Sequence, residues 1–269
     1  MLELYQFELS HYSEKVRFLL DFKGLDYRKV EVTPSIGQME VFQLSGQSAV
    51  PVLKDGETVV ADSTEIARYL ERQYPEPAAI PSAPRERGLC WLMEEWADES
   101  IGLKGRRALI GALNQNQNLR ASLLPDQTPD AFKTLVSAVP PELLDVLGAG
   151  VGVGGNALKE AQSGIEQDLE ALSLLLEAQP YLVAETPTLA DFAVAGLSAV
   201  IKFPSQAYLE LPADLADRGI PGLADNPAYA RFFEWRDRLY HDYRRPRVPS
   251  TPGTGGSANG DSPTLIAIE

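Results

Sequence analysis

The sequence predicts a two-domain protein in which an α/β domain is followed by an all-helical domain. Three observations in the 269 residues lead to this prediction. Strand and helix patterns alternate at first, prolines then crowd one short stretch, and apolar residues beyond it recur at helical spacing. Because proline does not fit inside a helix, the crowded stretch is expected to be a linker. We therefore place a thioredoxin-like α/β domain at residues 1–76, a linker at 77–84 and an all-α helical bundle at 85–245.

The first domain is expected to alternate strands and helices. Short runs such as LELYQF and YRKVEV predict strands at residues 2–7, 27–32, 50–53 and 58–61. Apolar residues at helical spacing predict helices at residues 13–23, 37–44 and 62–73. A Lys54-Asp55-Gly56 turn joins the last two strands into a hairpin, and Gly24 suits the position after the first helix. The resulting order, βαβαββα, is that of the thioredoxin fold.

The second domain is expected to be helical, with one long interruption. Helical spacing marks residues 89–96 and 158–176, and further helices are expected from residue 188 and over 227–240. Residues 119–155 are expected to form a long insertion with short helices at 131–136 and 142–147. The tail at 246–269 is rich in Pro, Gly and Ser, which predicts disorder.

The composition argues against several classes of function. A net charge of −14 repels phosphate backbones, so nucleic-acid binding is not expected. No run of about 18 apolar residues is present and the start does not resemble a secretory signal, so we expect no membrane span and a cytoplasmic protein. The single cysteine, Cys90, excludes an internal disulfide, and with only His11 and His241 beside it no metal site is expected.

Four short motifs follow one another along the chain. They are Ser10-His11-Tyr12-Ser13-Glu14-Lys15-Val16-Arg17, Ala49-Val50-Pro51-Val52-Leu53, Asp62-Ser63-Thr64-Glu65-Ile66 and Thr188-Leu189-Ala190-Asp191-Phe192. Each resembles a segment of the serine-type glutathione transferases, in the same order and at similar spacing. The resemblance covers most of the chain outside the long insertion and the tail. It implies the glutathione transferase architecture, glutathione as co-substrate, an apolar electrophilic substrate and a homodimer.

Ser10 is the candidate catalytic residue. A free thiol has a pKa of about 8.5, and lowering it by about two units takes roughly 2.7 kcal/mol. A hydrogen bond to the charged sulfur contributes roughly 1.5–3 kcal/mol, and a helix N-terminus adds about 0.3–1. The resemblance places Ser10 at the start of the first helix, as the donor to the glutathione sulfur. Ser10 equally suits a plain helix cap, for which Ser13 competes, and Tyr5 is the alternative hydroxyl donor.

Four residues are expected to bind glutathione. Pro51 fits a cis-proline, and the resemblance implies that the backbone of Val50 pairs with the cysteinyl part of glutathione. Asp62 and Ser63 open a helix, where Ser63 and the helix amides suit a carboxylate and Asp62 suits an ammonium. The γ-glutamyl end of glutathione carries both groups. The alternatives are an ordinary trans proline and a plain helix cap.

Two departures from the family pattern bear on affinity. His11 stands where proline is usual, and Ala49 replaces a longer side chain, which predicts weak glutathione binding. His11 is expected to be a surface residue, although a contact at the mouth of the site is an alternative.

Other features are interpreted as structural. Thr188 and Asp191 suit a helix cap, and Cys90 suits a buried core thiol. Residues 150–155 match a dinucleotide-binding motif, but the residues before them look helical rather than strand-like, so no such site is expected.

The leading hypothesis is an enzyme that transfers glutathione to an electrophilic small molecule bound against the helical domain near Tyr12. Two alternatives stay open. One is a non-catalytic, glutathione-transferase-like binding or assembly protein, and the other is a glutathione-dependent isomerase that uses the same thiolate. A cysteine-type thiol reductase ranks last, because Ser10 rather than a cysteine begins the first helix.

Overall fold

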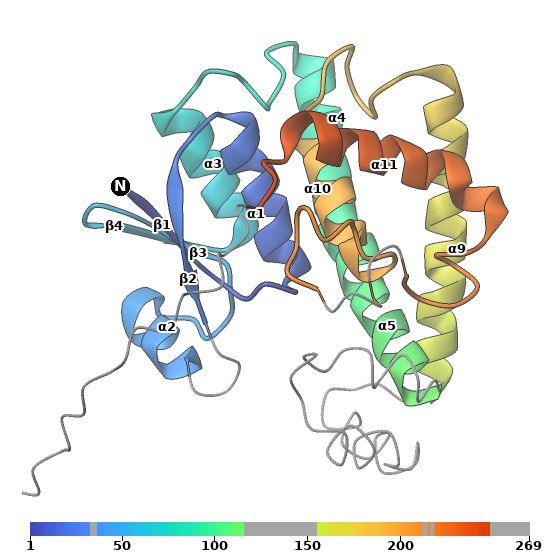
Figure 1. The fold of residues 1–269 in the computed structure, drawn as a ribbon. Helices are drawn as coiled ribbons and strands as arrows, with labels where there is room; N and C mark the ends of the chain where they lie inside the picture. Colours follow the sequence, from blue (N-terminus) through green and yellow to red (C-terminus); the bar gives the residue numbers. More distant parts are fainter. Residues whose placement is uncertain (33–36, 116–154, 212–214, 216–217, 248–269) are drawn as a thin grey trace, which may run out of the picture.

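The computed structural model describes residues 1–32, 37–115, 155–211, 215 and 218–247 (Figure 1). The short helices expected at 131–136 and 142–147, residues 150–154 of the glycine-rich motif and the tail after residue 247 lie outside the described residues. Within the described ranges, no helix combines the length and the apolar character needed to cross a membrane.

A four-stranded mixed sheet organises the first domain. Its strands are β1 (Leu2–Gln6), β2 (Tyr27–Glu31), β3 (Val52–Asp55) and β4 (Thr58–Ala61). They lie in the order β2-β1-β3-β4, with β1 parallel to β2 and the other two pairs antiparallel. This arrangement confirms the thioredoxin-like fold that the order of elements predicts.

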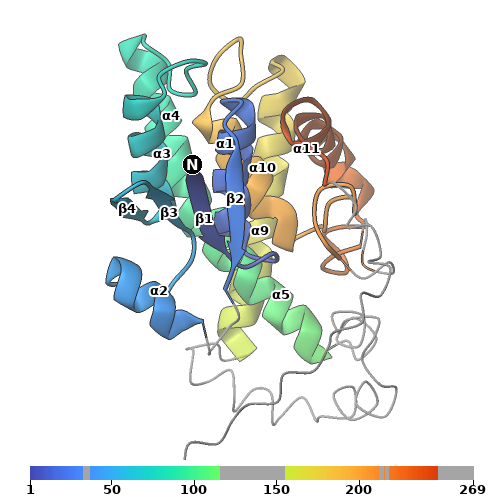
Figure 2. The ribbon, with the colours of Figure 1, turned by 60° about the vertical axis from the view of Figure 1, so that its left-hand side comes forward.

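Helices cover both faces of this sheet. Helices α1 (His11–Phe22) and α3 (Ser63–Gln73) pack on one face, and α2 (Gln38–Ser45) lies apart from them (Figure 2). Successive side chains of a strand point to opposite faces, which divides the apolar residues between two clusters. Leu4 and Leu53 belong to the large cluster with α1 and α3, whereas Tyr5 and Val52 pack with Val41 of α2.

In the first domain, two elements start two residues away from their predicted first residues. The first helix begins at His11 rather than at residue 13, because Ser10 and not Ser13 is its N-cap. The third strand begins at Val52 rather than at residue 50, since Pro51 has no N–H to give to a ladder. Gly24 adopts the expected left-handed conformation after α1, with φ of 68°.

The second domain is a bundle of helices. Helix α4 (Pro84–Trp96), the π-helical segment η1 (Ala97–Gly102) and α5 (Leu103–Gln115) follow one another without a break and form one long rod (Figure 1). The remaining elements are α9 (Gly155–Ala178), α10 (Leu189–Leu197), η2 (Ser198–Val200), η3 (Pro227–Tyr229) and α11 (Ala230–Tyr243). The helix starts expected at residues 188 and 227 are therefore found within one residue.

Helix α10 lies at the centre of the molecule, and all nine of its residues are buried. It packs along α1 (Figures 1 and 2), and Gly196 permits this close approach. A Cβ at Gly196 would lie 2.7 Å from the backbone nitrogen of Lys15. One apolar cluster runs from Leu4 in the sheet through Phe18 to Phe192. The two domains therefore share a core, and α1 is packed between the sheet and α10.

Candidate active site

Three chain segments meet at one end of the strands, where β1 and β4 finish and β3 begins. We call this end the sheet edge. Tyr5 near the end of β1 pairs with Val52 at the start of β3, and Val52 pairs with Ala61 at the end of β4. The residues after β1, before β3 and after β4 therefore lie along the same edge. These segments carry all the candidate residues, Ser10, Val50, Pro51, Asp62 and Ser63. Both α1 and α3 begin at this edge, so their N-terminal amides face it.

Ser10 is partly exposed and caps α1. Its Oγ accepts the backbone N–H of Ser13 at 3.2 Å, and its own N–H donates to the carbonyl of Phe7 at 2.8 Å. Because the hydroxyl oxygen acts as an acceptor in this cap, its proton is left for a ligand at the edge. The cap and the donor role are therefore compatible in one side chain.

The peptide bond between Val50 and Pro51 is cis, as the sequence predicts. Val50 is half-buried and precedes the ladder, whose first pair is Val52 with Tyr5. Among the described residues, the N–H and C=O of Val50 bond to no other backbone group. They are thus available to an extended peptide ligand along the edge.

Asp62 and Ser63 begin α3 in different ways. Asp62 has φ of 74°, a conformation that costs energy for a residue with a Cβ and is often found at functional sites. Its Oδ1 accepts the N–H groups of Thr64 at 2.9 Å and Glu65 at 3.1 Å, while the residue itself is exposed. Ser63 is buried, and its Oγ accepts Lys15 Nζ at 3.3 Å. Its hydroxyl proton and backbone N–H are left as donors.

Residues 4–78 match the sequence family described as glutathione S-transferase, N-terminal domain. A zeta-class glutathione S-transferase of Euphorbia esula is 40% identical over 103 residues, which cover 37% of this chain and 46% of the relative. A glutathione S-transferase structure from Rhodospirillum rubrum matches with a TM-score of 0.61 and 22% identity, over 89% of this chain and 88% of the other. Residues 4–78 therefore carry a glutathione S-transferase N-terminal domain, and the chain as a whole has the glutathione S-transferase fold.

The sequence likeness is concentrated in the first part of the chain. A maleylacetoacetate isomerase of Pseudomonas aeruginosa is 36% identical over 103 residues, covering 34% of this chain and 48% of that protein. The chain thus spans about half the length of these two curated relatives. The likeness of the second domain to glutathione S-transferases is a likeness of fold, carried by the structural match at 22% identity.

A buried ion-pair network lies behind the candidate site. Lys15 of α1 is 1% exposed, and its Nζ contacts Glu94, Asp98 at 2.8 Å, and the hydroxyls of Ser63 at 3.3 Å and Thr64 at 3.4 Å. Burial raises the pKa of Asp98 to about 6, although Lys15 acts in the opposite direction. One ammonium held by two carboxylates therefore ties the start of α3 to α1 and to the α4–η1 junction.

The sequence analysis does not identify this network. Lys15 belongs to the first motif, but the motif does not predict which acidic residues contact the Lys15 side chain. The available signal is the pair Glu94 and Asp98, four residues apart and so on neighbouring turns of one helical rod.

The structure shows that the surface expectation for His11 is wrong. His11 is 6% exposed, and its ring packs on Tyr12 with centroids 4.5 Å apart. Burial, with Arg106 nearby, lowers the pKa of His11 to about 4, while a hydrogen bond with the Gly102 backbone acts in the opposite direction. The reason is the earlier helix start, which places His11 in the first turn against η1 instead of on a loop. His11 is therefore a neutral, buried residue.

Tyr12 and Tyr5 occupy different surroundings. The Tyr12 hydroxyl donates to the backbone carbonyl of Asp98 at 3.0 Å, and burial raises the pKa of Tyr12 to about 12. Tyr12 is thus protonated and tied to the helical domain. Tyr5 packs in the apolar cluster on the α2 side of the sheet, as a strand aromatic does.

Proposed function

We propose that this protein is a glutathione transferase that joins the thiolate of glutathione to an electrophilic centre of an apolar small molecule. The observation that carries the proposal is the hydroxyl of Ser10, which caps α1 as an acceptor and keeps its proton for a ligand. The match of residues 4–78 to the glutathione S-transferase N-terminal domain supports glutathione as that ligand.

Glutathione lies along the sheet edge in this proposal. The N–H and C=O of Val50 pair with the cysteinyl residue as a neighbouring strand would. The exposed carboxylate of Asp62 binds the γ-glutamyl ammonium, and Ser63 with the N-terminal amides of α3 binds the γ-glutamyl carboxylate. With both ends of the tripeptide held, the cysteinyl sulfur faces Ser10 at the start of α1.

Ser10 acts on the sulfur as a hydrogen-bond donor and forms no covalent bond. Its O–H stabilises the thiolate, and the thiol proton passes to solvent. A sulfur electron pair then forms the new bond to the electrophile, whose leaving group departs with the pair of the broken bond. The apolar substrate lies against the helical domain near Tyr12, where apolar walls exclude water.

Replacing Ser10 by alanine is expected to lower kcat/KM for a chromogenic electrophile roughly ten- to hundredfold, because a hydrogen bond to a charged atom is worth roughly 1.5–3 kcal/mol. Loss of the cap lowers the free energy of unfolding by only about 1 kcal/mol, so the variant stays folded. Steady-state kinetics with glutathione measure the effect.

Ser13→Ala is the matched control for this variant. Ser13 lies in the same turn of α1, and among the described residues its buried Oγ has no hydrogen-bond partner. Its replacement is expected to leave turnover unchanged, and Ser10→Thr is expected to restore most of the activity. Equal rates for Ser10→Ala and the wild type would show that Ser10 has another role.

A glutathione-dependent isomerase is the second candidate, favoured by the likeness to a maleylacetoacetate isomerase. It needs the same thiolate but returns glutathione at the end of each cycle. Product analysis separates the two reactions, because conjugation consumes one glutathione per turnover and isomerisation consumes none. A protein that gives no heat with millimolar glutathione in isothermal titration belongs instead to the third candidate class, non-catalytic binding or assembly proteins.

We also propose a homodimer that uses α4 and α9. An apolar groove of about 300 Å³ between these helices is lined by Met93, Trp96, Gln167, Asp168, Ala171, Leu172 and Leu175. Leu92 on α4 is 69% exposed, and Leu174 on α9 is exposed as well. Apolar side chains gathered on one face favour a partner, and a second copy presents the same face around a two-fold axis.

Leu92→Glu is expected to convert the dimer to single chains at micromolar concentration, because it places a charge in an apolar interface. Sedimentation equilibrium measures the mass directly. Met39→Glu, at an exposed apolar residue of α2 on the other domain, is the control and is expected to stay dimeric. A wild type that sediments as one chain, or a Leu92→Glu variant that stays dimeric, would contradict this interface.

A further inference from the structure

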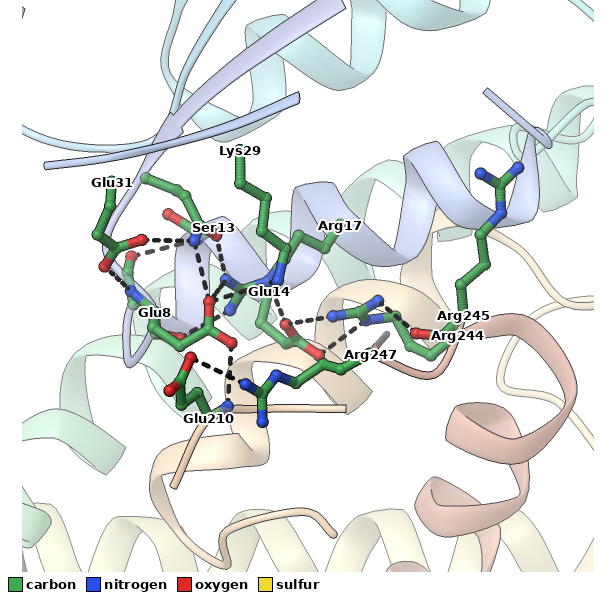
Figure 3. A network of polar contacts seen from close by, with 12 residues as sticks. Glu8, Ser13, Glu14, Arg17, Lys29, Glu31, Glu210, Arg244, Arg245 and Arg247 are labelled. Carbon is green, nitrogen blue, oxygen red and sulfur yellow. Dashed lines mark hydrogen bonds and ion pairs between the residues drawn. The ribbon is translucent and has the colours of Figure 1, made fainter. Parts of the chain in front are cut away.

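The chain returns to the first helix after α11. Arg244 directly follows α11, and its side chain is 2% exposed. Its Nε and Nη2 donate to the two carboxylate oxygens of Glu14 at 2.9 and 3.1 Å (Figure 3). Its Nη1 pairs with Asp21. This contact joins residues that are 230 positions apart in the sequence.

Glu14 is shared by two arginines. Arg17, one turn further along α1, also donates to its carboxylate. Burial of Glu14 acts to raise its pKa, but Arg17 and Arg244 outweigh burial and lower that pKa to about 2. Glu14 is therefore ionised at every physiological pH, and without Arg244 a buried charge would keep only one of its two partners.

Ser10 is joined to Glu14 through the backbone of α1. The N–H of Glu14 donates to the carbonyl of Ser10 at 2.9 Å, so the two residues share the first turn of α1. On the other side of Ser10, Arg17 Nη2 donates to the carbonyl of Glu8 at 2.9 Å. Ser10 therefore lies between Glu8 and Glu14 in the sequence, and Arg17 contacts both of these residues.

Arg247 is connected to Glu8 through Glu210. Its Nη2 pairs with the carboxylate of Glu210 at 2.8 Å, and the backbone N–H of Glu210 donates to the carboxylate of Glu8 at 3.1 Å (Figure 3). The segment after α11 thus contacts Glu14 directly and Glu8 through Glu210.

We propose that Arg244 and Arg247 form a positioning element for Ser10, in which Arg244 acts through Glu14 and touches no substrate. The inference rests on the proposed function, since it concerns the hydroxyl assigned to the glutathione sulfur. Displacing that hydroxyl weakens thiolate stabilisation but leaves glutathione binding in place, because Val50, Asp62 and Ser63 lie on other elements. The expected signature is a loss in kcat with little change in KM.

Arg244→Lys tests this proposal, because lysine keeps the positive charge but cannot make the bidentate hydrogen bond with the Glu14 carboxylate. We expect kcat to fall about tenfold, KM for glutathione to change less than about twofold, and the thiol pKa of bound glutathione to rise by about one unit. Ultraviolet absorbance of the thiolate reports that pKa. Arg28→Gln is the control, because the exposed Arg28 side chain pairs with Glu3 and this variant is expected to leave all three values unchanged. An unaltered thiol pKa in Arg244→Lys overturns the proposal.

Amide hydrogen exchange separates this inference from the proposed function. In Arg244→Lys the amides of Ser13 and Glu14 are expected to exchange about tenfold faster, relative to the second half of α1. Equal protection overturns the inference even in an active transferase. A wild type that does not ionise glutathione disproves the proposed function, while the exchange result still decides whether Arg244 fixes the position of Ser10.

If Arg244→Lys does not fold, Arg247→Gln provides the same test. The amides of residues 8–10 are then expected to exchange about two- to threefold faster. No change in their exchange would count against the inference.

Discussion

Replacing Gly196 by alanine is expected to lower the free energy of unfolding by about 3 kcal/mol, the upper end of what overpacking usually costs. The added Cβ would lie 2.7 Å from the nitrogen and 2.8 Å from the Cα of Lys15. Both are backbone atoms of α1, so no side chain can rotate away and the two helices must separate. Urea denaturation followed by circular dichroism measures the loss. Because α1 also carries Ser10, turnover is expected to fall with it.

Gly88→Ala provides the matched control on α4. Gly88 is exposed, and a Cβ there meets no atom within 4 Å. Alanine is the better helix former, so this variant is expected to gain about 0.5–1 kcal/mol. If both variants change stability by the same amount and sign, the contact between α1 and α10 is not as tight as described.

Replacing Asp191 by alanine is expected to lower the free energy of unfolding by about 3–5 kcal/mol, in the range of lost buried hydrogen-bond networks. The Asp191 carboxylate is fully buried and accepts the N–H of Leu182, the N–H of Thr188 and the Thr188 hydroxyl, each at 2.8 Å. Alanine leaves all three donors without this acceptor, at the start of the most buried helix. Thermal and urea unfolding of the purified variant measure the effect.

Asn226→Ala removes a helix cap of the ordinary exposed kind. Asn226 Oδ1 accepts the N–H of Ala228 at 3.0 Å at the start of η3. Water replaces this acceptor, so the expected loss is only about 1 kcal/mol. Comparable losses in both variants would mean that the Asp191 carboxylate does no more than cap a helix.

The sequence predicts the fold well because its signals are local. The strand–turn–strand pattern around Gly56, the left-handed Gly24 and the helix start at Thr188 are each set by a few neighbouring residues. Cys90 is fully buried, as its apolar helical surroundings predict. The start of α1 is different, because Ser10 and Ser13 are equally good caps. The burial of His11 against η1, a contact with the second domain, accompanies the earlier start.

The candidate site also has a part that the sequence predicts and a part that it does not. Strand pairing brings the segments around Ser10, Pro51 and Asp62 to one edge, so a correct order of strands is enough to place them together. The contacts of Lys15 and Arg244 could not be predicted, because each depends on packing between distant elements. The composition offers no help, since 38 acids against 24 lysines and arginines give every cation several possible partners.

The contact between Arg244 and Glu14 also sets an order of events during synthesis. Ribosomes add about 5–20 residues per second, so the 230 residues between the two side chains take roughly 10–50 s to make. During that time Glu14 of the nascent first domain has Arg17 as a partner but lacks Arg244, and Asp21 lacks Arg244 as well. The full set of contacts around the first turn of α1 therefore forms only after the last helix of the second domain has left the ribosome, so the earliest part of the chain to emerge is among the last to be completed.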